Sequence, residues 1–425
     1  MKRHRALALA AVLAATAVQV IAGAGAAAAA PPAGACQDPS PAQAEVPALP
    51  WAQQLLAPQR AWPYSRGDGV LVAVVDSGVD ADHPQLRRAG KILPGRDFYL
   101  NGALPGDFDC VSHGTGVASI IAADPAPGIG FAGIAPGAAI LPVRVSDRDV
   151  SDRGQVQRID PQVVANGIRY AADQGAKVIN LSLAGLDDFP AIRDAVAYAV
   201  AGDAVVVAAA GNAQQDAAAR FPSYPAGYPG VLGVGAVDID GARLSASQIG
   251  PYVGVAAPGV KVLAATRAGG HAYDDGTSFA APFVAGTAAL VRAAWPRLTA
   301  AQVIQRIKAT ASPARGGAGS PAYGAGLVDP YRAVTDGLDL GEPAALPAYA
   351  PQPPDRAQLA HAAWEAHTGA AAAWLLGAAG CALALVAAAA VAVPRGKRRR
   401  WRAALAPPVP AHRPADEPPE QIFLL

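Results

Sequence analysis

The chain has 425 residues and a formal net charge of +1, and only 16% of its residues are charged. Because it has no basic excess, nucleic acid is excluded as an expected partner. The length allows one large domain or two to three domains of average size. The 45 Gly residues suit close packing of helices on a sheet, and the 39 Pro residues cluster near both ends of the chain.

Residues 1–30 have the pattern of a secretory signal peptide. Lys2, Arg3 and Arg5 form a basic start, and an apolar run follows from Ala6 to about Ala30. A retained anchor helix is one alternative, since the run is long enough to span a membrane. Lipidation at Cys36 is another, although the preceding residues do not fit the usual lipoprotein site well.

From about residue 70, apolar strand-like runs alternate with helical runs. The predicted strands cover residues 71–75, 140–145, 178–183, 205–210 and 231–237, and the predicted helices cover 114–123, 163–174, 191–201 and 283–294. Continuous apolar strands separated by helices indicate an α/β fold, with a parallel central sheet covered by helices on both faces. In such folds the chemistry lies at the carboxyl ends of the strands.

Three short segments carry the side chains of nucleophilic acyl transfer. Asp76 follows the strand 71–75, His113 opens a helix, and Ser278 lies in a tight turn before an apolar helix. A serine attacks, a histidine takes and returns the proton, and a carboxylate holds the imidazole in its tautomer. A Gly-Thr-Ser turn alone is commonly only a turn or cap, but the chain order Asp, His, Ser is a known solution to this geometry.

The same segments, Asp76-Ser77-Gly78, Ser112–Ala118 and Gly276–Pro282, resemble the motifs of the subtilisin-like serine proteases. The resemblance runs from about residue 67 to residue 333. It implies the three-layer subtilisin fold and the activity of a serine endopeptidase (EC 3.4.21 class), with no cofactor.

The resemblance also implies an oxyanion hole. In this family the Asn of an Ala-Ala-Gly-Asn turn donates its amide to the oxyanion, and Asn212 matches that position. The backbone N–H of Ser278 would be the second donor. The alternative is that Asn212 only takes the left-handed backbone conformation after Gly211.

The segment Ser182-Leu183-Ala184-Gly185 resembles the one that pairs with the substrate backbone. Ser182, Leu183 and Ala184 are therefore expected substrate-binding residues, with Gly211 on the opposite wall of the specificity pocket. Small residues in both walls favour an apolar or small P1 side chain over a charged one.

Residues 31–66 are too short for an independent domain. Trp51, Leu55, Leu56, Trp62 and Pro63 are expected to pack this extension onto the catalytic domain. The run from Trp51 to Leu56, followed by Trp62, resembles the entry to mycosins, the membrane-anchored subtilisin-like proteases of type VII secretion systems.

Two of the three cysteines, Cys36 and Cys110, would lie outside the cell, where disulfides persist. We expect them to pair and to fix the extension beside the rim of the active site. Diacylglycerol on Cys36 would exclude this pairing.

No metal site is expected. A metal could be considered at five aspartates, but they lack the alternating spacing of a calcium loop with its closing Glu, and a solvated loop is the favoured interpretation. These residues are Asp68, Asp80, Asp82, Asp107 and Asp109.

The C-terminal part has the pattern of a membrane anchor. Residues 337–368 form a Pro- and Ala-rich linker with a short helix around residues 356–367, and the uncharged apolar run 369–393 is long enough to span a bilayer. The basic cluster that follows Pro394 should remain in the cytoplasm with the tail, residues 394–425.

This architecture predicts a signal peptide, a wrapped extension, a peptidase domain over residues 67–336, and one C-terminal transmembrane helix. The expected protein lies in the cell membrane with its catalytic domain outside, and cleaves polypeptides exported by a type VII secretion complex. The alternative is a scaffold that stabilises the secretion complex, with proteolysis dispensable.

Overall fold

The computed structural model describes residues 31–100, 104–147, 159–214, 216, 220–317, 319–338 and 356–401. The chain divides into two units, residues 1–342 and 343–425. The predicted signal peptide lies outside the described residues, as do residues 339–355 of the predicted linker and residues 402–425 of the predicted cytoplasmic tail.

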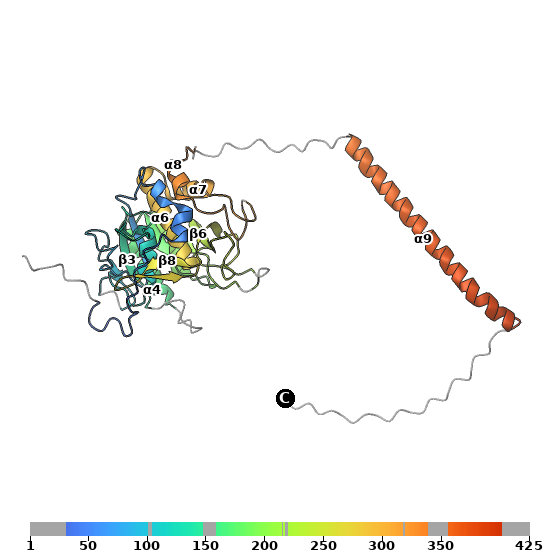
Figure 1. The fold of residues 1–425 in the computed structure, drawn as a ribbon, viewed down its shortest axis with the longest axis horizontal. Coiled ribbons are helices and arrows are strands. Elements are labelled where there is room, and N and C mark those ends of the chain that lie inside the picture. The colour runs from blue at the N-terminus through green and yellow to red at the C-terminus, as the bar shows by residue number, and fades with distance from the viewer. Residues whose placement is uncertain are drawn as a thin grey trace, which may run out of the picture. The chain divides into compact units, whose positions relative to one another are not determined.

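A seven-stranded parallel sheet forms the centre of the first unit (Figure 1). Its strand order is β2-β3-β1-β4-β5-β6-β7, so the strand that ends at Asp76 is flanked on both sides. The strands are β1 Leu71–Asp76, β2 Arg96–Asp97, β3 Ala139–Arg144, β4 Val178–Leu181, β5 Val205–Ala209, β6 Val231–Val237 and β7 Val253–Pro258. All five predicted strands are present and pair in parallel, which confirms the predicted sheet.

Helices cover both faces of this sheet. One core contains Val72 and Val74 of β1 with the helices α3 (His113–Ala122) and α6 (Thr277–Ala294). The other contains Ala73 and Val75 of β1 with α4 (Pro161–Asp173) and α5 (Pro190–Ala201). Successive β1 side chains thus enter opposite cores, as strand geometry requires. The result is the predicted three-layer, subtilisin-like α/β fold.

Short elements outside the sheet are not anticipated by the sequence pattern. β8 (Val262–Ala265) and β9 (His271–Asp274) form an antiparallel hairpin. Two further helices, α7 (Ala300–Ala309) and α8 (Pro330–Thr335), follow α6 in the chain. α6 also begins at Thr277, six residues earlier than predicted, with Pro282 inside it.

The N-terminal extension packs on the rest of the first unit through one side of α2 (Trp51–Leu56) and the turn η1 (Pro58–Arg60). The Trp51 indole donates to the carbonyls of Val260 and Lys261, Trp62 donates to Ile134, and Leu56 is buried. Leu55 and Pro63 were expected to pack as well, but both are exposed. A helix as short as α2 has only one face toward the core, and Leu55 lies off that face.

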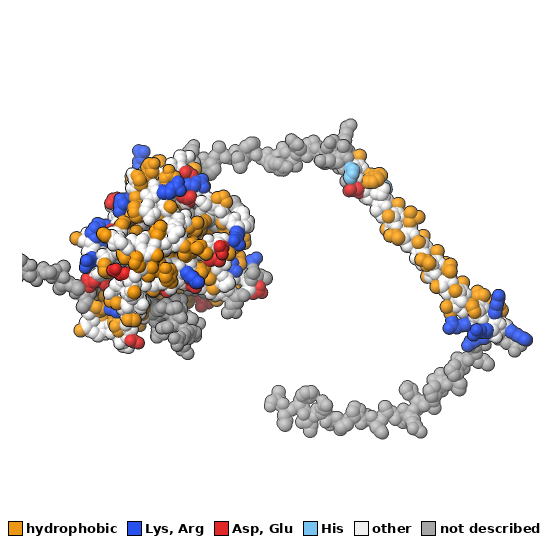
Figure 2. All heavy atoms as spheres, in the orientation of Figure 1, with side chains coloured by type: hydrophobic (Ala, Val, Ile, Leu, Met, Phe, Trp, Pro, Cys, Tyr) orange, Lys and Arg blue, Asp and Glu red, His pale blue; other side chains and the backbone are white. Residues whose placement is uncertain are grey.

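The described part of the second unit is one helix, α9 (Arg356–Arg398). Its stretch Ala363–Arg398 is a candidate membrane span, because a window of 18 residues within it has a mean hydropathy of 2.3. Apolar side chains follow one another along α9, and Lys and Arg gather at one end (Figure 2). The predicted break between a short helix and the apolar run is absent, and Pro394 does not end the helix. Pro394 lies four residues before the end of α9, so its missing N–H removes only one backbone hydrogen bond in the last turn of the helix.

Candidate active site

Three elements deliver the predicted triad side chains. Asp76 is the last residue of β1, His113 is the first residue of α3, and Ser278 is the second residue of α6. Asp76 Oδ1 accepts a hydrogen bond from His113 Nδ1 at 2.7 Å. Because that nitrogen carries the proton, Nε2 is the ring nitrogen that can act as a base. The two side chains are almost fully buried.

Ser278 lies beside this pair through its neighbour Phe279. The Phe279 ring packs edge-on against the His113 ring, with 5.1 Å between ring centroids. Close packing at the head of α3 also depends on Gly114. A Cβ there would stand 2.0 Å from the Gly78 carbonyl oxygen and 3.2 Å from the Asp76 Cβ. Only glycine lets α3 start this close to the end of β1.

The turn that presents Ser278 is held by Ser182, because Pro282 leaves the Ser278 carbonyl without its helical donor. Pro282 has no N–H for the Ser278 carbonyl four residues earlier. Ser182 Oγ donates to that carbonyl instead, at 2.7 Å, and itself accepts from Asn180 Nδ2 at 2.9 Å. The Ser182 side chain is therefore buried and supports the serine turn.

Asn212 follows β5 and lies against the same turn. Its Oδ1 accepts from both the backbone N–H and the hydroxyl of Thr277, each at 3.0 Å. This fixes the orientation of the amide, since only oxygen can accept from a backbone N–H. Nδ2 stands 3.1 Å from where a Cβ of Gly276 would lie. Gly211, with φ 96°, takes the left-handed conformation, and Asn212 does not, so that alternative for Asn212 is wrong.

The two predicted pocket walls lie next to one another. The Ala184 Cβ is 3.3 Å from where a Gly211 Cβ would be. Leu183 is partly buried against the second core, and Ala184 is exposed. The segment is anchored one residue later, where Gly185 exchanges two backbone hydrogen bonds with Tyr224.

Tyr224 also borders a cavity of about 400 Å³, whose walls include Ser223, Tyr252 and Lys308. None of the three triad residues lines this cavity. The predicted catalytic residues therefore do not open into this cavity.

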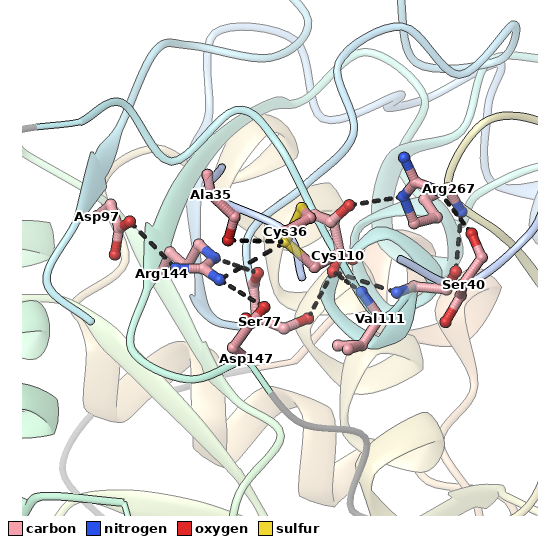
Figure 3. Close-up of a disulfide and its surroundings, with 12 residues drawn as sticks. Ala35, Cys36, Ser40, Ser77, Asp97, Cys110, Val111, Arg144, Asp147 and Arg267 are labelled. Carbon is pink, nitrogen blue, oxygen red and sulfur yellow. Dashed lines mark hydrogen bonds and ion pairs between the residues drawn. A yellow bond between two sulfur atoms is a disulfide. The ribbon is translucent and has the colours of Figure 1, made fainter. Parts of the chain in front are cut away.

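A disulfide joins Cys36 of the extension to Cys110, three residues before His113 (Figure 3). The predicted pairing is confirmed. Arg144 lies beside it, with Nη2 3.8 Å from the Cys110 sulfur, and forms ion pairs with Asp97 and Asp147. The disulfide thus ties the extension to the loop that leads into the histidine helix.

The sequence-based prediction for Asp109 is wrong. Asp109 was expected in a solvated loop, but it is 1% exposed and accepts hydrogen bonds from the start of α3. Its position four residues before His113 is the signal that could have identified it, because a carboxylate there can cap the helix.

Comparison with known proteins agrees with this geometry. The subtilase family model matches residues 67–326. Thermitase of Thermoactinomyces vulgaris is 41% identical over 239 residues, 56% of this chain and 80% of the relative. Mycosin-4 of Mycobacterium tuberculosis is 38% identical over 387 aligned positions, covering 80% of each protein.

Among solved structures, a chain of an intact ESX-5 inner membrane complex is similar with a TM-score of 0.61 and 33% identity. The match covers 82% of this chain and 93% of that one. Mycosin-4 and the chain of the ESX-5 complex thus match 80% and 82% of this chain, whereas Thermitase matches 56% of it. The chain belongs to the subtilase family of serine proteases and is of the mycosin type.

Proposed function

We propose that this serine protease is membrane-anchored, acts outside the cytoplasm, and cleaves proteins exported by a type VII secretion system. The observation that carries its catalytic part is the 2.7 Å hydrogen bond between Asp76 and His113 at the head of α3, beside the helix start that bears Ser278. Asp76 is the carboxylate that orients the imidazole, His113 is the base, and Ser278 is the nucleophile of the proposed protease.

In the proposed reaction, His113 Nε2 takes the proton of Ser278 Oγ as that oxygen attacks the scissile carbonyl. Asp76 stabilises the imidazolium that forms. The developing oxyanion accepts from Asn212 Nδ2 and from the Ser278 backbone N–H, which has no intrahelical acceptor at the second position of α6. His113 then protonates the leaving amine, and water releases the acyl group by the same steps.

Substrate would bind along Leu183 and Ala184 as an added strand, with Gly211 forming the facing wall. The close approach of Ala184 and Gly211 supports a preference for small or apolar P1 side chains. Ser182 contributes indirectly, because its hydroxyl holds the Ser278 carbonyl. A peptide library with a strict Arg or Lys preference at P1 would contradict this part of the proposal.

The membrane part of the proposal rests on α9 and on the relatives. Ala363–Arg398 is long and apolar enough to cross a bilayer, and its basic end fits the cytoplasmic side by the positive-inside rule. The similar chain in the ESX-5 inner membrane complex supports a place for this protein in such an assembly.

The test of the catalytic part is labelling of the full chain, in detergent, with a serine-directed phosphonate. We expect label on the wild type and none on Ser278→Ala. Ser245→Ala is the matched control, because Ser245 is exposed in the loop between β6 and β7, and this variant should label fully. Labelling that persists in Ser278→Ala would overturn the assignment.

A second candidate is a scaffold role in the secretion complex, favoured by the same ESX-5 match over 82% of this chain. Secretion by a strain carrying Ser278→Ala, compared with a full deletion, separates the two. Normal secretion in the point variant and loss in the deletion would favour the scaffold, and loss in both would favour proteolysis.

A further inference from the structure

The buried carboxylate of Asp109 has no part in the proposed reaction, yet it lies within the same hydrogen-bond network. Its Oδ1 accepts from the backbone N–H groups of Val111 and Ser112 at 3.0 and 3.1 Å. Its Oδ2 accepts from the backbone N–H and the hydroxyl of Thr115 at 2.9 and 2.7 Å. Four donors from the segment around His113 therefore converge on one side chain.

These donors define how α3 begins. Ser112, the residue before His113, has φ 73° and makes no side-chain cap of the helix. A non-glycine residue in this conformation costs on the order of 1 kcal/mol and persists only where its surroundings impose it. Asp109 imposes it by holding the N–H of Ser112 from one side and that of Thr115, inside the first turn, from the other. A negative charge at this helix end is also favoured by the helix dipole.

A fifth hydrogen bond links Asp109 to the strand that bears the catalytic acid. Ser77 Oγ donates to Asp109 Oδ1 at 3.1 Å and accepts from the Gly114 N–H at 2.9 Å. The backbone N–H of Ser77 donates to Asp76 Oδ1 at 2.7 Å, the same oxygen that receives His113 Nδ1. The bonds form a closed circuit from Asp109 through Ser77 and Asp76 to His113, and back through the start of α3.

We propose that Asp109 is a positioning residue, which acts through Ser77 to fix the His113 imidazole against Asp76. The proposal rests on the triad assigned under the proposed function. Asp109 does not touch the reacting atoms. Its carboxylate accepts all five bonds only in its ionised form, since a protonated oxygen would face an N–H or O–H donor. Burial raises the pKa of Asp109, and the hydrogen bonds from Thr115 and Val111 oppose that effect.

Asp109→Asn is the first test, in the full chain purified in detergent. The amide keeps the shape of the carboxylate but presents an NH2 group to donors that need an acceptor. We expect kcat to fall by about tenfold to hundredfold, the cost of a small misplacement of a catalytic group, with KM little changed. The far-downfield proton resonance of His113 Nδ1–H should shift or broaden, which a purely structural role would not cause.

Ser77 supplies the second test, which holds even if Asp109→Asn fails to fold. Ser77→Ala removes the bridge, whereas Ser77→Thr keeps a hydroxyl in the same place. We expect reduced kcat and an altered His113 resonance in Ser77→Ala, and both restored in Ser77→Thr. Equal kcat and an unchanged resonance in these two variants would overturn the proposal, as would a folded Asp109→Asn with wild-type values.

Ser278→Ala is measured alongside, to separate this inference from the function on which it rests. Loss of activity in Ser278→Ala with wild-type behaviour of the Asp109 and Ser77 variants refutes only the positioning role. Retained activity in Ser278→Ala refutes the triad itself and the positioning role with it.

Discussion

The buried histidine His271 should make the stability of the first unit depend on pH. Its Nδ1 accepts a hydrogen bond from the Val46 amide at 3.2 Å, and its Nε2 lies 2.8 Å from Gln85 Oε1. The Gln85 amide is oriented by two bonds that its Nε2 donates to backbone carbonyls. His271 is therefore neutral when folded, with its proton on Nε2, and a second proton would point at the Val46 N–H.

The magnitude follows from the shift of its pKa. Burial first, and then the charge of nearby His83, lowers the pKa of His271 from 6.5 to about 4. Between these values the unfolded chain binds a proton that the folded chain does not. The free energy of unfolding is thus highest above pH 6.5 and falls as the pH drops through this window. At about 1.4 kcal/mol per pKa unit, the loss between pH 7 and pH 5 is about 2 kcal/mol.

Urea unfolding at pH 7 and pH 5 measures this loss. Gln at position 271 cannot titrate, so His271→Gln should lose about 2 kcal/mol less than the wild type over the same interval. His361→Gln is the control, because His361 lies on α9 in the second unit, outside the fold whose unfolding is measured, and this variant should lose as much free energy of unfolding as the wild type. Equal losses in the wild type and His271→Gln would refute the reasoning.

Two further predictions concern the histidine helix and the loop before it. Replacing both Cys36 and Cys110 by Ser should lower the free energy of unfolding by about 4 kcal/mol, because the disulfide closes a loop with a sequence separation of 74 and so reduces the chain entropy of the unfolded state. Urea titration measures this loss, and an unchanged midpoint of unfolding would contradict it. Gly114→Ala should abolish activity and destabilise the fold, because the added Cβ would stand 2.0 Å from the Gly78 carbonyl oxygen. Gly337→Ala is the control and should do neither, because a Cβ at Gly337 would have no other atom within 4 Å. Thermal melting and peptide hydrolysis report both effects, and an active Gly114→Ala variant would show that α3 can move.

Five of the seven strands of the main sheet can be predicted because their signal is local, whereas the two-residue strand β2 and the strand β7 are not predicted. Strands such as β1 and β5 are buried on both faces, so each reads as an unbroken apolar run, and the helices between them show the longer period. The β8–β9 hairpin gives no such signal. Its strands have four residues each, and His271 and Tyr273 interrupt the apolar pattern of β9.

Some residues of the candidate active site can be predicted from local motifs, and others cannot. Asp76, His113 and Ser278 can be identified because each stands at a junction of a strand or helix, within a short motif. The role of Asp109 depends on Ser77, 32 residues away in the sequence, and no local pattern reports that contact. Ser182 is expected to meet substrate from its motif, but no local pattern reports that its hydroxyl donates to the Ser278 carbonyl, 96 residues away, which Pro282 leaves without an N–H donor.

The extension is attached to the rest of the first unit at several separate points, so the disulfide alone does not hold it in place. Beyond Cys36, the Gln43 N–H donates to the Gly269 carbonyl, and the Ala44 carbonyl accepts from the His271 N–H. Further along, the Trp51 indole is bound to the carbonyls of two more residues. These attachments are separate contacts along the extension, so breaking one of them leaves the others formed. Reduction of the disulfide should therefore release the segment around Cys36 from the loop before the histidine helix, while α2 stays in place. Acid acts further along the extension, at the Val46 contact of His271. After correction for the intrinsic pH dependence of exchange, protection of the Val46 and His271 amides should therefore fall in acid, and protection near Cys36 should fall with reductant.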